Sequence, residues 1–248
     1  GKTTLLRTIV GLERADKGTV RLFGTDCADE KQFRAQRPKI GFLFQDSDDQ
    51  LFCPTVIEDV AFGPLNIGCT EAEATARARE VLDGLGIGHL ADRISHKLSG
   101  GEKRLVCLAG LFAMGPDVLL LDEPTNYLDL EGALWLETYL ARYPHTVLII
   151  SHDRGLLNRA VGSILHLEDR KLTLYQGGYD RFVETRAARL AAAQSEARKQ
   201  EARRAHLQSY VDRFRYKADK ARQAQSRLKA LARMQPISAP QEAALRRF

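Results

Sequence analysis

Two uninterrupted apolar runs, at residues 118–121 and 146–150, constrain the fold of this chain more than any other feature. Neither run alternates apolar with polar residues, so each is typical of a strand that is covered on both faces inside a parallel sheet. Over residues 1–183, short β-branched stretches alternate with helical stretches, and Gly or Pro stands at the joints. This alternation predicts an α/β domain with a mostly parallel sheet.

Acidic residues and a histidine follow these two runs directly. Asp122 and Glu123 come after the first run, and Ser151 and His152 come after the second. In sheets of this kind, active residues lie just past the carboxyl ends of the strands. We therefore expect a functional site at this edge of the sheet.

The domain organisation follows from changes in composition. A stretch rich in Ala, Glu and Arg predicts a surface helix at 70–90, and a second helix is predicted at 99–114. Both belong to a helical lobe inserted at about 46–115. The next part of the chain lacks Gly and Pro, which predicts a long basic helical arm at 184–235. We expect 236–248 to begin a linker to a second domain that is missing here.

The net charge of +5 hides an asymmetry along the chain. Residues 186–248 carry 16 Lys and Arg against 5 Asp and Glu, a balance of +11, whereas the other 185 residues carry 21 against 27, a balance of −6. An acidic body suits Mg-nucleotide chemistry, and a basic tail suits a polyanion such as RNA. The composition of the tail fits a solvated helix with excess Arg equally well.

Periodicity within the arm is typical of a coiled coil, because a seam of mostly apolar residues recurs at spacings of four and three. The residues of this seam are Leu207, Val211, Phe214, Ala218, Ala221, Gln225, Leu228 and Ala232. The period indicates one long helix, and it also allows a helical hairpin with its turn near 215–219.

The sequence contains no run of about 18 or more apolar residues and no leader in which an apolar stretch follows charged residues. The cysteines are far apart and show no metal-ligand spacing; they are Cys27, Cys53, Cys69 and Cys107. We expect reduced thiols and a cytoplasmic protein.

The chain opens with Gly1-Lys2-Thr3-Thr4, followed by an apolar helical stretch at 5–10. The four residues match the last positions of the phosphate-binding loop G-x-x-x-x-G-K-[ST]. In that loop backbone N–H groups cradle phosphates, so Lys2 would reach the β and γ phosphates and Thr3 would hold Mg²⁺. Alone, the tetrapeptide also fits a chance sequence at the start of a surface helix.

Asp122 and Glu123 are the two acids that such a site needs at the end of a strand. Asp122 would anchor Mg²⁺, directly or through water, and Glu123 would orient or deprotonate the attacking water. The alternative is a strand that simply ends in two surface carboxylates.

A third motif is Ser99-Gly100-Gly101, at the start of a predicted helix and about twenty residues before Asp122. Its unpaired N–H groups and the positive end of the helix dipole suit a γ-phosphate, although alone it also fits a helix N-cap with flexible glycines. Together the three motifs resemble the signature set of ATP-binding cassette (ABC) ATPases over residues 1–183. The resemblance implies a P-loop fold with a helical signature lobe, ATP and Mg²⁺ as cofactors, and ATP hydrolysis.

The resemblance also assigns roles to residues further along the chain. Gln45, after a predicted strand at 40–44, resembles the Q-loop glutamine that contacts Mg²⁺ and the attacking water. Asp129 resembles the D-loop aspartate that communicates across the interface between two cassettes. His152 resembles the switch histidine, whose imidazole would contact the γ-phosphate and help to align water with Glu123.

In this family two cassettes sandwich two ATP molecules, and each phosphate loop faces the signature of the partner. The resemblance therefore implies that Ser99, Gly100 and Gly101 act on a nucleotide bound by a second cassette, in tandem or as a dimer. The glycine-rich first half of the phosphate loop and the adenine-stacking aromatic would precede residue 1. We accordingly expect an N-terminally truncated fragment.

The resemblance divides between two branches of the family. Residues 41–68 and 98–111 are similar to the ATPases of energy-coupling importers for metals and vitamins, whose Q-loop region receives a coupling helix from a transmembrane protein. Residues 126–131, 150–154 and 175–179 are similar to the ABC-F family, which consists of soluble paired-cassette proteins that act on ribosomes.

The basic arm is similar to the ABC-F linker that reaches tRNA at the ribosomal peptidyl site. There Arg and Lys would meet phosphates, and Phe214 or Tyr216 could stack on a base. The residues assigned to nucleic acid on this basis are Arg213, Arg215, Lys217, Lys220, Arg222 and Arg227.

The similarity to importers extends over 1–126 and that to ABC-F over 119–234, so it changes within the segment that both branches share, 119–126. A chimera joined there, by recombination or faulty assembly, explains this change better than one divergent ancestor. We expect an ABC-F-like ATPase associated with the ribosome and tRNA. The alternatives are the ATPase subunit of an energy-coupling importer and a fragment with neither function.

Overall fold

The computed structural model describes residues 1–214 and 221–234. The chain divides into two compact units, Gly1–Gly178 and Tyr179–Phe248. The second unit begins with a helix at Tyr179, five residues before the predicted start of the arm. The predicted linker at 236–248 lies outside the described residues.

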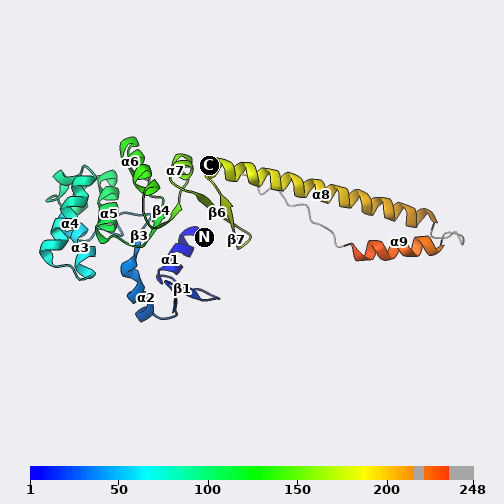
Figure 1. The fold of residues 1–248 in the computed structure, drawn as a ribbon, viewed down its shortest axis with the longest axis horizontal. Helices are drawn as coiled ribbons and strands as arrows, with labels where there is room; N and C mark the ends of the chain where they lie inside the picture. Colours follow the sequence, from blue (N-terminus) through cyan, green and yellow to red (C-terminus); the bar gives the residue numbers. More distant parts are fainter. Residues whose placement is uncertain (215–220, 235–248) are drawn as a thin grey trace. The chain divides into compact units, whose positions relative to one another are not determined.

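A parallel sheet forms the centre of the first unit (Figure 1). It consists of β3 (Ile40–Leu43), β4 (Val118–Asp122) and β5 (Thr146–Ile150), in the order β3-β4-β5. The two strands expected from the apolar runs are confirmed, and β4 runs on to include Asp122. The strand expected at 40–44 ends one residue earlier, at Leu43.

Different helices cover the two faces of this sheet. Leu119 and Leu121 are fully buried on one face, whereas Leu120 packs with Leu6 on the other. Both faces of β4 are therefore apolar, which explains why its sequence does not alternate. The face of Leu119 is covered by α5 (Gly100–Met114), α6 (Leu130–Ala141) and α7 (Arg154–Arg159), and the face of Leu120 by α1 (Lys2–Ile9).

The helical lobe has its own apolar core between α3 (Val56–Asn66), α4 (Glu71–Gly84) and α5. The predicted helix at 99–114 is confirmed as α5. The helix predicted at 70–90 is shorter, because Gly86 adopts a left-handed φ of 72° and ends α4 after Gly84.

Two antiparallel strand pairs, β1-β2 and β6-β7, accompany the parallel sheet. These and the remaining short elements are β1 (Val20–Leu22), β2 (Thr25–Cys27), α2 (Glu30–Gln36), β6 (Ser163–Glu168), β7 (Lys171–Gln176) and the 3-10 turns Arg37–Lys39, Gly88–Leu90 and Ser95–Lys97.

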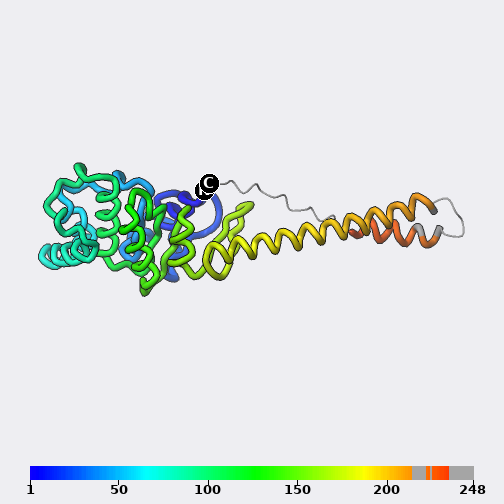
Figure 2. Tube along the Cα trace, turned by 90° about the horizontal axis from the view of Figure 1, so that it is seen from above, coloured from blue at the N-terminus to red at the C-terminus, as the bar shows by residue number. Residues whose placement is uncertain are grey.

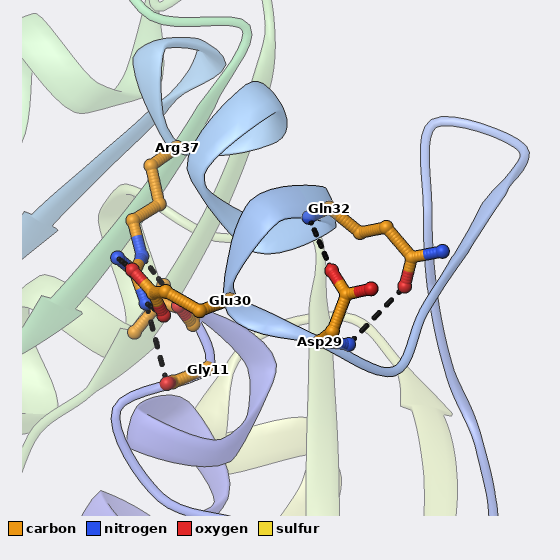
Figure 3. A network of polar contacts seen from close by, with 6 residues as sticks. Gly11, Asp29, Glu30, Gln32 and Arg37 are labelled. Carbon is orange, nitrogen blue, oxygen red and sulfur yellow. Dashed lines mark hydrogen bonds and ion pairs between the residues drawn. The ribbon is translucent and has the colours of Figure 1, made fainter.

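Arg37 fastens the end of α1 to the start of β3 (Figure 3). Its Nε donates to the carbonyl of Val10 at 2.9 Å and its Nη2 to that of Gly11 at 3.3 Å. The guanidinium also pairs with Glu30, with 2.9 Å between Nη2 and Oε2, and this hydrogen bond lowers the pKa of Glu30. These contacts fix the end of α1, while Leu6 and Val10 pack its apolar side against Ile40 and Leu120 of the sheet.

The second unit is a helical hairpin of α8 (Tyr179–Phe214) and α9 (Ala221–Arg233). Figure 2 shows α9 running beside the last part of α8. Tyr210 fixes the pair, because its hydroxyl donates to Gln223 Oε1 at 2.9 Å and the Arg227 guanidinium lies 3.5 Å from the centre of its ring. Of the two expected forms of the arm, the hairpin is confirmed and the single long helix is wrong.

The coiled-coil seam predicted along one helix is wrong in its second half. Val211 is 3% exposed, as a seam residue should be, but Leu228 is 52% exposed. Among the α9 residues whose burial is described, Arg227 and Leu231 are the half-buried ones instead. The chain reverses between the two helices, and a reversal resets the helical phase that the seam requires. The predicted turn at 215–219 lies outside the described residues.

None of the helices within the described residues is both long enough and apolar enough to cross a membrane.

Candidate active site

Asp122 ends β4 with its side chain turned into the protein. The residue is 1% exposed, and within the described part of the chain its Oδ2 atom has no hydrogen-bond partner. A buried carboxylate oxygen without a donor is costly unless a cation or a proton meets it. The atom is therefore suited to a cation, and Mg²⁺ prefers oxygen ligands of this kind.

Glu123 follows in a strained backbone conformation. Its φ of 49° is left-handed, which is uncommon outside Gly, and residues held in such conformations are enriched at functional sites. Its N–H donates to the carbonyl of Ile150 at 2.8 Å, so the neighbouring strand β5 helps to fix it. The residue is 8% exposed, which leaves the carboxylate largely sheltered from water.

His152 meets Glu123 at the edge of the sheet. Its backbone N–H donates to Glu123 Oε2 at 3.2 Å, and its Nε2 lies 3.3 Å from Oε1. The register of the sheet brings the two together, because it pairs Asp122 with Ile150. The structure thus gathers Asp122, Glu123 and His152 at the carboxyl edge that the sequence indicates.

Gln45 lies two residues beyond the end of β3, and β3 is the strand that pairs with β4 in the sheet. Its side chain is exposed, while its backbone carbonyl and that of Phe44 accept hydrogen bonds from Arg104 at 3.5 and 2.6 Å. The same guanidinium binds the backbone of Asp122 and Glu123. Gln45 is therefore anchored beside the two acids through its backbone.

Arg104 belongs to none of the motifs found in the sequence, although its side chain binds the backbone of Asp122 and Glu123. Its side chain is fully buried, and on α5 it shares a face with the buried Leu108 and Leu111. A charged residue on the apolar face of a helix was the signal that could have found it, because a buried Arg almost always has specific partners.

Ser99, Gly100 and Gly101 form the N-terminal end of α5. Ser99 Oγ accepts from the N–H of Glu102 at 3.3 Å, and Glu102 Oε2 accepts from the N–H of Ser99 at 2.7 Å. The helix-capping role that the sequence allows is thus present. The hydrogen bond from the Ser99 N–H lowers the pKa of Glu102. A Cβ at Gly101 would lie 2.8 Å from the carbonyl oxygen of Tyr127, so that position requires glycine for packing alone.

The other predicted residues have different surroundings. Asp129 caps α6 by accepting from the N–H of Gly132 at 2.8 Å. Lys2 and Thr4 are exposed and Thr3 is half-buried at the start of α1. None of the hydrogen bonds named above joins these three residues to Asp122, Glu123 or His152.

Three of the residues assigned to nucleic acid lie on the described helices of the hairpin. Arg213 and Arg222 are exposed, and Arg227 is half-buried over Tyr210. The described α9 contains basic residues and no acidic one. The remaining three assigned residues, Arg215, Lys217 and Lys220, lie outside the described residues.

The donor set suits a metal that is shared with a nucleotide. Among the described residues there is no group of three or more His, Cys, Asp or Glu side chains arranged to hold a metal ion alone. Mg²⁺ at a nucleotide needs only one or two carboxylates, because phosphates and waters supply its other ligands. Asp122 alone therefore fits Mg²⁺ in complex with ATP and would not fit a structural metal.

A separate cavity of about 440 Å³ lies between α6 and the start of β5. Its lining includes Trp135, Tyr139, Pro144 and His145. Because His145 precedes β5 and His152 follows it, the cavity lies at the other end of that strand from the acids. It is not the site that the acids form.

Comparison of the sequence with models of protein families shows to which family the chain belongs. Two models, both described as ABC transporter, match residues 1–126 and 165–248. This chain belongs to the ABC family. It is 54% identical over 172 residues to a putative ABC transporter ATP-binding protein of Brucella suis. The match covers 69% of this chain and 72% of the relative.

The chain is also similar to an ABC-F protein. ABC transporter F family member 3 of Arabidopsis thaliana is 43% identical over 162 residues, which is 65% of the chain and 23% of the relative. The chain thus spans less than a quarter of that protein.

Two solved structures share the fold of the cassette. cbiO1 from Clostridium perfringens, described as part of the ABC transporter complex cbiONQ, has a TM-score of 0.63 and 31% identity, covering 76% of this chain and 77% of its own. The dimeric ATP-binding cassette MJ0796 with ADP and Pi has a TM-score of 0.65 and 25% identity, covering 71% and 80%. The P-loop ABC ATPase fold and ATP hydrolysis by a cassette of this family are thereby established, as the sequence indicates.

Proposed function

We propose that ATP is hydrolysed at the edge of the sheet where Asp122, Glu123 and His152 lie. The contact between Glu123 and His152, beside the buried Oδ2 of Asp122, supports this most directly. The Glu123 carboxylate orients a water molecule and accepts its proton as the water attacks the γ-phosphate. His152 holds that carboxylate through its N–H and imidazole and is placed to contact the phosphate.

The remaining residues bind and orient the nucleotide. Lys2 and the N–H groups of Gly1, Thr3 and Thr4 at the start of α1 would hold the phosphates. Thr3, Gln45 and Asp122 would hold Mg²⁺. The ion would neutralise charge on the phosphate oxygens.

The cassette is proposed to work with a second one. Ser99, Gly100 and Gly101 would face the γ-phosphate of a nucleotide bound by the partner, and Asp129 would lie at the interface. The dimeric state of the similar cassette MJ0796 supports this arrangement. Ser99 and Gly100 are exposed and Gly101 is half-buried, so the signature end of α5 is accessible to such a partner.

For its biological role we propose an ABC-F-like factor that contacts the ribosome and tRNA through the α8–α9 hairpin. The identity to an ABC-F protein and the excess of basic residues on α9 support this. Exposed Arg and Lys would meet RNA phosphates, while the stacked Arg227 and Tyr210 keep the two helices together.

Charge reversal on the hairpin should weaken ribosome binding. In the full-length gene product, Arg213→Glu, Arg222→Glu and Lys229→Glu together are expected to lower the affinity for ribosomes at least about tenfold, because each reversal removes a phosphate contact. The salt dependence of binding should also become shallower. Co-sedimentation with ribosomes over a salt series measures both.

A matched control separates this from a general effect of charge. Lys31, Arg77 and Arg79 are exposed on the first unit, and their reversal to Glu changes the net charge equally. The control should bind normally. Equal binding by the two triple variants would exclude the hairpin as the ribosome contact.

An exposed aromatic pair on the helical lobe favours a second candidate, the importer ATPase. Phe52 is 64% exposed and Phe62 44%, with their ring centres 4.6 Å apart in an edge-to-face arrangement. Leu65, at 42% exposure, adds to the apolar surface. Such a patch beside the Q-loop region suits a coupling helix of a membrane protein.

The importer role predicts a membrane partner that depends on this pair. Phe52→Ser and Phe62→Ser would then abolish recovery of the partner from detergent extracts, because the apolar docking surface is lost. Leu172→Ser and Leu174→Ser on β7, which are 48% and 58% exposed, are the matched control. If the ABC-F role is correct, affinity purification recovers ribosomes with both pairs and no membrane protein.

A further inference from the structure

The guanidinium of Arg104 holds together the backbone of two segments that carry candidate catalytic residues. The side chain is 0% exposed. Nη2 donates to the carbonyls of Asp122 and Glu123 at 2.6 and 2.7 Å. Nη1 donates to the carbonyl of Phe44 at 2.6 Å, and longer contacts reach the carbonyls of Gln45 at 3.5 Å and Pro124 at 3.4 Å.

The chemistry of these contacts is unusual for a buried cation. Each acceptor is a backbone carbonyl, and no carboxylate hydrogen-bonds the guanidinium in the described residues. Burial lowers the pKa of Arg104, while the nearby Asp122 and Glu123 act in the opposite direction. Arg keeps its charge under such conditions, and its planar fork of donors matches several fixed acceptors at once.

The acceptors are placed where the site needs rigidity. Glu123 has the left-handed φ of 49°, and such a conformation persists only where its surroundings enforce it. Its backbone is held on one side by Ile150 of β5 and on the other by Arg104. The same guanidinium binds the carbonyl of Phe44 at 2.6 Å, so one side chain links the backbone next to Gln45 with that of Glu123.

Arg104 belongs to α5, so its hydrogen bonds connect this helix to the backbone of Glu123. Arg104 lies about one helical turn after Gly101. Gly101 in turn lies against the carbonyl of Tyr127, downstream of Glu123. Residues 99–101 and Arg104 therefore belong to one continuous stretch at the start of α5, and Arg104 connects this stretch to the backbone of Glu123.

We propose that Arg104 is a positioning residue that couples the signature end of α5 to the catalytic acid Glu123 and to the Gln45 segment. This rests on the role proposed above for Glu123. Contact of Ser99, Gly100 and Gly101 with a nucleotide on a second cassette sets the position of α5, and Arg104 thereby aligns the acid in its own site. Arg104 itself does not touch ATP.

The test compares Arg104→Lys and Arg104→Met in the full-length gene product. Lys keeps a cation with three donors but cannot span both segments, and Met keeps the apolar stem without donors. We expect kcat for ATP hydrolysis to fall roughly tenfold in Arg104→Lys and roughly a hundredfold in Arg104→Met, since small misplacements of reacting groups cost this much. The Kd for ATP measured without Mg²⁺ should change less than about twofold, because no hydrogen bond of Arg104 reaches Lys2, Thr3 or Thr4.

A matched control separates positioning from stability. Leu108 lies one turn further along α5, is fully buried in the apolar cluster with Leu119 and Leu121, and has no side-chain donor for these carbonyls. Leu108→Ala should lower Tm but keep kcat per ATP-binding molecule normal. If Arg104→Met does not fold, Arg104→Lys decides alone.

The outcomes are distinct. A normal kcat per ATP-binding molecule in Arg104→Lys, together with an inactive Glu123→Gln, overturns the inference and leaves the proposed site intact. A fall in kcat that Leu108→Ala reproduces at equal Tm assigns Arg104 a purely structural role. Normal hydrolysis by Glu123→Gln instead removes the proposed catalytic role on which the inference depends.

Discussion

Glu123→Gln is expected to lower kcat for ATP hydrolysis by roughly 10² to 10⁴-fold, the usual contribution of a general base. The amide has the same shape but cannot accept the proton of the attacking water. Its oxygen can still accept the N–H of His152, which holds the present carboxylate at 3.2 Å. The local geometry and the binding of ATP should therefore survive, and the variant should retain bound ATP.

Single-turnover hydrolysis and the ratio of ATP to ADP on the purified full-length gene product measure this effect. Glu131→Gln is the control, because Glu131 is an exposed acid in the first turn of α6. Its kcat should equal that of the unaltered protein. Rapid hydrolysis by Glu123→Gln would show that another group activates the water, and the assignment of Glu123 would have to be abandoned.

The core strands could be predicted because their burial is visible in composition. Leu119, Leu120 and Leu121 alternate between two apolar clusters, and only an unbroken apolar run satisfies both. The acids at the end of the run then lie at the active edge through the geometry of parallel strands. The proximity of Glu123 to His152 adds the register of β4 with β5, which sequence patterns do not contain.

The parts that the sequence did not predict depend on contacts between distant segments. The seam of the arm failed at Leu228 because a reversal of the chain changes which face of α9 is buried. Arg104 was overlooked because its partners are backbone carbonyls, and carbonyls have no sequence signature. The requirement for glycine at Gly101 likewise comes from the Tyr127 carbonyl rather than from a phosphate.

The two roles open to the Ser99-Gly100-Gly101 motif illustrate how structure and function can share residues. Ser99 and Glu102 cap α5 reciprocally, so two N–H groups at the helix end are already satisfied. Anion binding by this end would then rely on the remaining N–H groups and the helix dipole. Capping and nucleotide contact are compatible, and loss of activity after a change at Ser99 would not by itself distinguish them.

Asp122→Asn is expected to change stability and activity in opposite directions. Asp122 is 1% exposed, and its Oδ2 has no partner among the residues that the structure describes. Removal of this buried charge should raise the free energy of unfolding without Mg²⁺ by about 1 kcal/mol. The same change removes an anionic ligand, so kcat should fall at least about a hundredfold and half-maximal hydrolysis should require at least about tenfold more Mg²⁺.

Thermal unfolding with and without Mg²⁺ and ATP gives a readout that does not depend on turnover. Ligands that bind only the folded state raise Tm by mass action, so Mg²⁺ with ATP should stabilise the unaltered protein well above ATP alone. In Asp122→Asn that difference should largely vanish. Asp117→Asn, an exposed change just before the opposite end of β4, should leave it intact. If the Asp122→Asn variant is less stable without Mg²⁺, yet gains as much from Mg²⁺ as the unaltered protein, the Asp122 carboxylate is satisfied within the fold and does not hold the ion.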